Sequence, residues 1–373
     1  MRALRSWSPS LQLKHMKFID EFRNKEIAEG LIQRIRKTSA RPVQLMEVCG
    51  THTVSIFRYG IRGLLPKHIT LLSGPGCPVC VTPNADIDLA IALSRQKDTI
   101  IVTFGDMMRV PGSTSSLQKE KAEGSDIRII YSSLDALKIA KENPGERVVF
   151  LAIGFETTSP TIAVAILRAK EEKLRNLFFL DSQKRVPPAL IALLQSKRVK
   201  IDGLILPGHV STILGTKPYR FISKDFDRPA VVTGFEPLDI LQGIWMLLKQ
   251  IEENRAAVEI QYRRVVHEEG NPTALSKIYQ VFEDGEGHWR GLGLIPDSGY
   301  RFKDPYNKMD VRNFDIEVEP TKEHPECLCG EVLQGIRSPL ECRLFKEVCH
   351  PENPIGPCMV SIEGTCHTYF KYQ

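Results

Sequence analysis

The stretch PVQLMEVCGTH, residues 42–52, combines an apolar run with a glycine-containing turn that carries a cysteine and a histidine. Two further apolar runs, residues 69–72 and 99–104, also end in glycine-containing turns, and segments with helical periodicity separate them. Further runs of this kind follow at residues 147–153, 177–180, 203–206 and 230–233. Strands that alternate with helices are typical of α/β proteins with parallel sheets. The sequence therefore predicts an α/β fold with two Rossmann-like units whose sheets are mainly parallel.

The length of 373 residues exceeds what one hydrophobic core usually supports, so several domains are expected. Apolar residues recur at helical spacing over residues 17–36 and again over 238–253. The region after residue 284 is rich in glycine, proline and charged residues and has few apolar runs. We therefore expect a bound metal or a cross-link to stabilise it. The predicted division is an N-terminal extension and helical arm (1–40), a first α/β domain (41–145), a second α/β domain (146–240), and a helical and cysteine-rich [4Fe-4S] domain (241–373).

Composition places the chain among ordinary globular proteins, with 42% hydrophobic and 25% charged residues. The net charge of +5, from 50 basic and 45 acidic residues, is spread along the chain and does not indicate nucleic-acid binding. No window is apolar enough for a membrane span, and the first fifteen residues do not resemble a secretory signal. The expected compartment is the cytoplasm. Thiols stay reduced there, so the nine cysteines favour metal binding or redox chemistry over structural disulfides.

The cysteines fall into two windows, from Cys49 to Cys80 and from Cys327 to Cys366. In the first window, Cys49 and His52 follow a predicted strand, where α/β sheets bind their ligands. A thiolate and an imidazole suit iron or zinc and leave coordination positions open. The alternative is a buried cysteine beside a histidine whose hydrogen bonds are satisfied.

Cys77 and Cys80 belong to the motif GPGCPVCVTP, which follows another predicted strand. Two thiols at this spacing can form a small disulfide ring, and a helix that starts there would lower their pKa. A redox-active dithiol is the favoured interpretation. The alternative is half of a four-cysteine zinc site.

Four polar residues also follow predicted strands: Asp106, Glu156, His209 and Glu236. If their strands are parallel neighbours, these side chains converge with the thiols on one crevice. Asp106 would then orient His52 or a substrate, with Arg109 nearby. The alternative is that they form ordinary ion pairs and helix caps.

The C-terminal window holds six cysteines within forty residues, which is strong evidence for a metal centre. The spacing matches neither a ferredoxin run nor a zinc ribbon, so an irregular [4Fe-4S] site is favoured and zinc is the alternative. The spacing alone does not identify the four ligands. The cysteines are Cys327, Cys329, Cys342, Cys349, Cys358 and Cys366.

From about residue 16 to the C-terminus the sequence resembles the HypD family, which acts in maturation of [NiFe] hydrogenases. The resemblance rests on a series of motifs in one order: MEVCGTH, GPGCPVC, FGDMMRVPG, GFETT, PGHVS, GFEPLD and the cysteine-rich tail. It implies a scaffold that, with the small partner HypC, carries iron while two cyanides and one carbon monoxide are added. Cyanide would come from HypE, charged by HypF, and the hydrogenase large subunit would be an indirect partner.

The resemblance also implies roles for single residues. Cys49 would bind the Fe(CN)2CO iron together with a cysteine of HypC, and His52 would assist. Cys77 and Cys80 would pass electrons toward the assembly site, so the chain would be a redox-active scaffold rather than a stand-alone enzyme. Val54 stands where some family members carry a second histidine. The implied ligands of the [4Fe-4S] cluster are Cys329, Cys342, Cys349 and Cys366, with Cys327 and Cys358 as spare thiols.

Two other functions remain open at this point. In the first, the chain is a thiol-disulfide oxidoreductase or iron-sulfur electron carrier that acts on a protein partner, and Cys49 is incidental. In the second, it is a zinc-stabilised enzyme that uses Asp106, Glu156 and His209 for acid and base chemistry. No phosphate-binding GxxxxGK[ST] loop occurs in the sequence.

Overall fold

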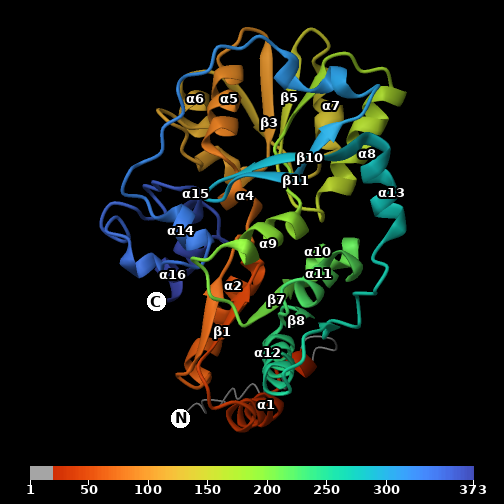
Figure 1. Cartoon of the computed structure of the whole chain (residues 1–373). Helices are drawn as coiled ribbons and strands as arrows, with labels where there is room; N and C mark the ends of the chain where they lie inside the picture. Colours follow the sequence, from red (N-terminus) through yellow and green to blue (C-terminus); the bar gives the residue numbers. More distant parts are fainter. Residues whose placement is uncertain (1–19) are drawn as a thin grey trace, which may run out of the picture.

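The computed structural model describes residues 20–373 (Figure 1). The N-terminal extension and the first residues of the predicted helical arm lie outside the described residues. The rest of the arm forms η1 (Asp20–Phe22), a 3-10 helix, and α1 (Lys25–Thr38). Helix α1 packs against α12 (Pro237–Glu252), which matches the helix predicted at 238–253.

The larger sheet, called sheet A, has five parallel strands in the order β2-β1-β7-β8-β9. Four of them match predicted strands, and β9 was not predicted because it is only three residues long. The strands are β1 (Val43–Glu47), β2 (Ile69–Ser73), β7 (Gly203–Pro207), β8 (Ala230–Thr233) and β9 (Val258–Ile260). Its accompanying helices are α2 (Gly50–Arg58), α3 (Ile61–Leu64), α10 (Gly208–Leu214), η3 (Lys217–Tyr219) and α11 (Arg220–Lys224).

The second sheet, called sheet B, has four parallel strands in the order β4-β3-β5-β6. Its strands are β3 (Thr99–Thr103), β4 (Asp126–Ile129), β5 (Arg147–Ala152) and β6 (Leu177–Asp181). The helices of this part are α4 (Pro78–Val81), α5 (Asn84–Ser94), η2 (Gly105–Arg109), α6 (Leu117–Ala122), α7 (Asp135–Glu142), α8 (Ser159–Glu171) and α9 (Val186–Gln195). The predicted α/β class with parallel sheets is confirmed.

The strands do not divide between the sheets at residue 145, where the sequence analysis placed a domain boundary. Strands β1 and β2 belong to sheet A, the chain then builds all of sheet B, and it returns to sheet A at β7. An apolar run shows that a strand is buried but not which strand it pairs with, so neighbours in sequence were assigned to one sheet. Sheet B is therefore an insertion between β2 and β7 of sheet A.

Strand order reverses at one point in each sheet, between β1 and β7 in sheet A and between β3 and β5 in sheet B. The carboxyl ends of strands at such points form the crevice where open α/β sheets bind ligands. The turns after β2, β3 and β5 border the same pocket. Figure 1 shows the two sheets one above the other, with α4 between them. The pocket therefore lies at the carboxyl ends of strands from both sheets.

The region after residue 284 contains more regular structure than its composition predicts. After α13 (Pro272–Val281), β10 (Phe282–Trp289) pairs with β11 (Gly293–Phe302) in an antiparallel hairpin. The exposed residues Asp284, Glu286 and His288 alternate with the more buried Gly285, Gly287 and Trp289, and the sequence analysis missed that period-two pattern. The hairpin packs against α9, and Phe302 of β11 lies near Phe179 of β6 in sheet B, with ring centroids 6.5 Å apart.

The C-terminal segment returns to both cysteine-bearing turns of the N-terminal half. Helix α15 packs against α4, and α16 packs against α2. None of the helices within residues 20–373 is long and apolar enough to cross a membrane. The elements of this segment are η4 (Asn307–Met309), η5 (Val311–Asn313), α14 (Cys329–Leu333), η6 (Pro339–Glu341), α15 (Pro357–Val360) and α16 (Thr365–Tyr372).

Candidate functional site

Cys49 and Cys77 lie on two turns that pack directly against each other. Cys49 follows β1 and is the N-cap residue of α2, and Cys77 follows β2 and is the N-cap residue of α4. The Gly50 N–H donates to the carbonyl of Gly76 at 2.9 Å. A Cβ atom at Gly76 would overlap the backbone of Cys49, so only glycine allows this approach. The two cysteine turns therefore hold each other in place.

Cys49 carries a buried thiol in a surrounding that favours its protonated form. Burial raises the pKa of Cys49 to about 12, and the nearby carboxylates of Glu363 and Glu47 add to the rise. The backbone N–H groups of His52 and Thr51, at the start of α2, act in the opposite direction. Because a bound cation competes with the proton for the sulfur, metal binding at Cys49 would release a proton.

Glu363 is a site residue that the sequence analysis missed. Its carboxylate accepts a hydrogen bond from the Thr51 hydroxyl at 2.6 Å. Its backbone lies so close to Gly50 that a Cβ there would come within 2.6 Å of the Glu363 carbonyl oxygen. The only signal in the sequence is its place three residues before Cys366, and nothing relates it to Cys49 before the chain folds.

His52 is fully buried and held through one ring nitrogen. Its Nε2 lies 3.0 Å from the carbonyl oxygen of Gly234 and 2.8 Å from the hydroxyl of Thr233. A carbonyl oxygen only accepts, so Nε2 carries the proton and Nδ1 keeps its lone pair. Nδ1 is buried without a partner among the described residues. Burial lowers the pKa of His52 to about 4, so the ring is neutral at physiological pH.

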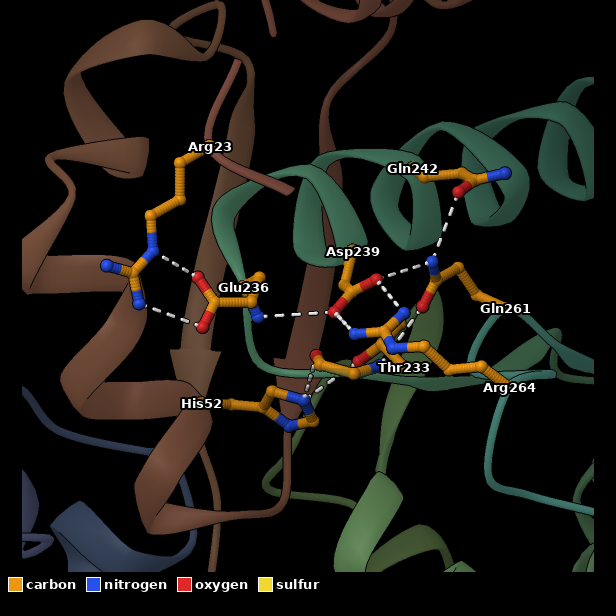
Figure 2. A network of polar contacts seen from close by, with 9 residues as sticks. Arg23, His52, Thr233, Glu236, Asp239, Gln242, Gln261 and Arg264 are labelled. Atoms are coloured by element: carbon orange, nitrogen blue, oxygen red, sulfur yellow. Dashed lines mark hydrogen bonds and ion pairs between the residues drawn. The ribbon is translucent and has the colours of Figure 1, made fainter. Parts of the chain in front are cut away.

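A polar network behind β8 fixes the loop that holds His52 (Figure 2). The Gly234 N–H donates to Gln261 Oε1 at 3.1 Å, and Gln261 Nε2 donates to Asp239 at 2.9 Å. Arg264 donates two hydrogen bonds to the same carboxylate, at 2.7 and 2.5 Å. The loop after β8 therefore orients His52, and of the two roles predicted for Asp106 only the orientation of a substrate stays a prediction.

His209 lies in a cluster with His52, whereas Glu236 forms a helix cap and an ion pair. The ring of Phe235 stacks on His52 at 4.6 Å and on His209 at 3.9 Å between centroids, so both histidines belong to one cluster. Partial burial lowers the pKa of His209. Glu236 instead caps α12 and forms an ion pair with Arg23 at 2.6 Å, as the structural alternative predicts.

Cys77 and Cys80 occupy the first turn of α4. The Cys80 N–H donates to the Cys77 sulfur at 3.4 Å, which is a helix-capping contact. Burial raises the pKa of Cys80 well above its usual value, opposite to the predicted lowering. The helix start is present, but loss of hydration at this fully buried thiol outweighs it.

Asp106 lines a pocket of about 740 Å³ between the sheets. The pocket is bordered by Cys77, by the turns after β3 and β5, and by Glu363 from the C-terminal segment. Arg109 does not line it, because its guanidinium donates to the backbone carbonyls of Pro351 and Val360 and anchors that segment. The pocket gives a ligand access to Cys77.

Glu156 lies outside this pocket, buried beneath the turn after β5. One carboxylate oxygen accepts from the Val186 N–H at 2.9 Å, and the other has no partner among the described residues. Burial raises the pKa of Glu156 to about 7. The predicted convergence on one crevice therefore applies to Cys77 and Asp106 and does not include Glu156.

Replacing Glu156 with glutamine is expected to raise the free energy of unfolding at pH 8 by up to about 3 kcal/mol and to change it little at pH 4.5. The folded state keeps the Glu156 proton up to about pH 7, whereas an unfolded chain releases it near 4.5. Stability of the parent therefore falls as pH rises between these values. Urea denaturation of both proteins at several pH values checks this, and parallel curves would contradict it.

All six C-terminal cysteines line one small pocket. Within residues 20–373 no three His, Cys, Asp or Glu side chains converge as ligands of a single metal ion. Six thiols around one pocket could supply the four thiolates of a [4Fe-4S] cluster. Four of them could equally serve as the ligands of a zinc ion, so zinc stays the alternative at this pocket.

Cys358 links this pocket to the dithiol of α4. Its sulfur lies 2.8 Å from that of Cys329, and it also interacts with the thiols of Cys80 and Cys366. Cys329 and Cys358 are both buried. A line of thiols thus runs from Cys77 through Cys80 and Cys358 into the C-terminal pocket. Cys358, classed as spare in the sequence analysis, occupies the middle of that line.

Comparison with known proteins finds relatives over nearly the whole chain. Residues 26–373 match the HypD family, described as "Hydrogenase formation hypA family". The chain is 47% identical over 368 residues to hydrogenase maturation factor HypD2 of Bradyrhizobium diazoefficiens, covering 96% of this chain and 97% of the relative. It is 44% identical to hydrogenase maturation factor HypD of Cupriavidus necator, with 96% and 97% covered, and 44% identical to that of Escherichia coli, with 96% and 98% covered.

Proposed function

Because the chain belongs to the HypD family, we propose that it is the scaffold on which the Fe(CN)2CO group of [NiFe] hydrogenases is assembled. The relatives are named hydrogenase maturation factors, and the resemblance in the cysteine motifs carries the finer role. Iron, cyanide and carbon monoxide are the cargo. A HypC-type protein would share the iron, a HypE-type protein would donate cyanide, and the hydrogenase large subunit would receive the product.

Cys49 would be the iron ligand of this chain. Its thiol lies at the start of a helix, against the turn of Cys77, and next to the carboxylate of Glu363. Loss of the Cys49 proton gives a soft thiolate, which suits ferrous iron with strong-field ligands. Tyr131 and Ile362 at the rim of the adjacent pocket are 93% and 65% exposed, so a protein partner has apolar side chains to cover.

The observation that carries the redox part of the proposal is the line of thiols described above. In reduction of a Cys77–Cys80 disulfide, two electrons and two protons convert the S–S bond into two thiols. Cys358, next to Cys80, is placed to attack that disulfide, with Cys329 at 2.8 Å to complete the exchange. The exchange leaves a Cys329–Cys358 disulfide. A [4Fe-4S] cluster held in the C-terminal pocket would pass two electrons, one at a time, from a low-potential protein donor to this disulfide, which takes up two protons and returns to two thiols.

The contact between Cys329 and Cys358 also affects which cysteines can bind the cluster. A Cys329 thiol that exchanges with Cys358 is not free to bind iron permanently. Cys327 lines the same pocket and is less buried. We therefore propose a ligand set in which Cys327 replaces Cys329 of the set implied by the family resemblance. The set is Cys327, Cys342, Cys349 and Cys366.

The test is an infrared spectrum of the anaerobically purified chain, produced together with its HypC and HypE partners. The parent is expected to show cyanide and carbonyl stretching bands, and a Cys49→Ala variant is expected to lack them because it cannot anchor the iron. The cluster absorbance should be equal in both preparations.

The electron-carrier alternative predicts a different result. It rests on the Cys80–Cys358 contact alone and leaves Cys49 without a role. A parent that binds its partners and holds its cluster, yet shows no such bands, would favour that alternative. Bands that persist in the Cys49→Ala variant would show that another residue anchors the iron.

A further inference from the structure

Glu47 places a buried carboxylate directly against Cys49, the proposed iron ligand. It is the last residue of β1, and only 1% of it is exposed. The Cys49 N–H donates a hydrogen bond to Glu47 Oε2 at 3.0 Å. The Thr53 hydroxyl donates to the other oxygen, Oε1, at 2.5 Å. The side chain of Glu47 therefore joins the end of β1 to the start of α2, with one contact at Cys49 and one beyond it.

The two cysteine-bearing helices are capped in different ways. Cys49 and Cys77 are the N-cap residues of α2 and α4, and an N-cap side chain usually holds the first turn of its helix. The Cys77 sulfur does so by accepting from the Cys80 N–H at 3.4 Å. Within the described part of the chain, the Cys49 side chain makes no capping hydrogen bond. The carboxylate of Glu47 holds this turn instead, and the Cys49 sulfur is left for a ligand.

The backbone of Glu47 is fixed by sheet A. Glu47 is in register with Ser73, the last residue of β2. Its carbonyl oxygen accepts from the Gly74 N–H at 2.8 Å, and a Cβ at Gly74 would come within 3.0 Å of that oxygen. Groups built on strands are held more precisely than groups on loops. The carboxylate is therefore a rigid support for the Cys49 turn.

We propose that Glu47 is the positioning residue of the iron anchor. Its two hydrogen bonds, to the Cys49 N–H and to the Thr53 hydroxyl, keep the Cys49 sulfur in one orientation for iron. This inference rests on the proposed function of Cys49. Residues that hold a metal ligand in place without touching the metal typically change metal affinity by about 10–100-fold when they are lost. Loss of both hydrogen bonds should therefore weaken iron binding far more than it disturbs the rest of the fold.

The experiment is an anaerobic titration of ferrous iron into the full chain in complex with its HypC partner, with a colorimetric chelator as competitor. Iron that a Cys49→Ala protein still binds is subtracted as background. Glu47→Leu removes both hydrogen bonds and is expected to weaken iron binding at Cys49 about tenfold. Glu47→Gln should bind iron as the parent does. Its amide oxygen can accept from the Cys49 N–H, while its NH2 group donates to the Thr53 hydroxyl oxygen.

Two further variants separate positioning from a general loss of stability. Thr53→Val keeps the shape of the side chain and breaks one of the two hydrogen bonds, so it should weaken iron binding less than Glu47→Leu and decides the question if that variant does not fold. In both variants the Cys49 amide should exchange its hydrogen faster than in the parent, with no iron present. Asn271→Ala removes the N-cap of α13, where Asn271 accepts from the Ala274 N–H at 3.0 Å, and should lower stability without changing iron binding.

Four results would overturn the inference. Folded Glu47→Leu and Thr53→Val proteins that bind iron as the parent does would show that the hydrogen bonds do not matter for iron. A Glu47→Gln protein that loses as much iron as Glu47→Leu would assign the effect to charge instead of position. An equal loss in Asn271→Ala would assign it to stability. A parent that binds no more iron than Cys49→Ala would overturn the proposed function of Cys49, and this inference with it.

Discussion

Replacing Gly76 with alanine is expected to abolish hydrogenase maturation and to lower the free energy of unfolding by about 1–3 kcal/mol. The added methyl group would overlap the backbone of Cys49, so the Cys49 and Cys77 turns must separate. Their separation breaks the hydrogen bond from Gly50 to the Gly76 carbonyl. Hydrogenase activity in a strain that depends on this chain, together with urea denaturation of the purified protein, measures both effects.

Gly30→Ala is the matched control for this prediction. Gly30 lies on an exposed face of α1, and a Cβ there meets nothing within 4 Å. Alanine in a helix interior is favoured over glycine by about 0.5–1 kcal/mol, so this variant should be slightly more stable and fully active. A Gly76→Ala protein that matures hydrogenase normally would show that the contact between the two cysteine turns is dispensable.

Cys327→Ala and Cys329→Ala are expected to differ sharply although the two residues are neighbours. The first should lose most of the cluster absorbance, because it removes a proposed iron ligand. The second should keep the cluster but fail to reduce the Cys77–Cys80 disulfide, because it removes the partner of Cys358. Iron and sulfide content and the visible spectrum report the cluster, and alkylation of free thiols after dithionite treatment reports the disulfide.

Cys358→Ala is the companion variant for this comparison. If Cys329 and Cys358 act as a pair, both substitutions should give the same loss of electron transfer with the cluster intact. A Cys329→Ala protein without a cluster, beside a Cys327→Ala protein that keeps it, would instead support the ligand set implied by the family resemblance.

Local sequence patterns predict the strands of this chain well and their pairing poorly. The strands that were predicted from short apolar runs are all present, because runs of this length are typical of buried strands. Strands β4 and β9 are too short or too polar to stand out. The insertion of sheet B into sheet A depends on contacts between residues that are more than a hundred positions apart, and no local pattern reports them.

The residues of the candidate site could likewise be predicted only in part from local sequence patterns. Cys49, Cys77 and the C-terminal cysteines could be singled out as candidates because cysteines grouped in short motifs are typical of metal and redox sites. Glu363 could not be, since a single charged residue carries no signal until the fold places it beside a thiol. The expected lowering of the Cys80 pKa failed for a related reason, because burial depends on the complete tertiary structure.

The insertion of sheet B also fixes the order in which the chain can mature on the ribosome. Strands β1 and β2, with Cys49 between them, leave the ribosome first but lack their neighbour β7 until more than a hundred further residues have been synthesised. The loop that holds His52 follows β8 and appears later still. Domains fold as units during synthesis, so sheet B can close before sheet A. The surroundings of the Cys49 turn are therefore complete only after Glu363, whose carboxylate accepts a hydrogen bond from Thr51, has been synthesised.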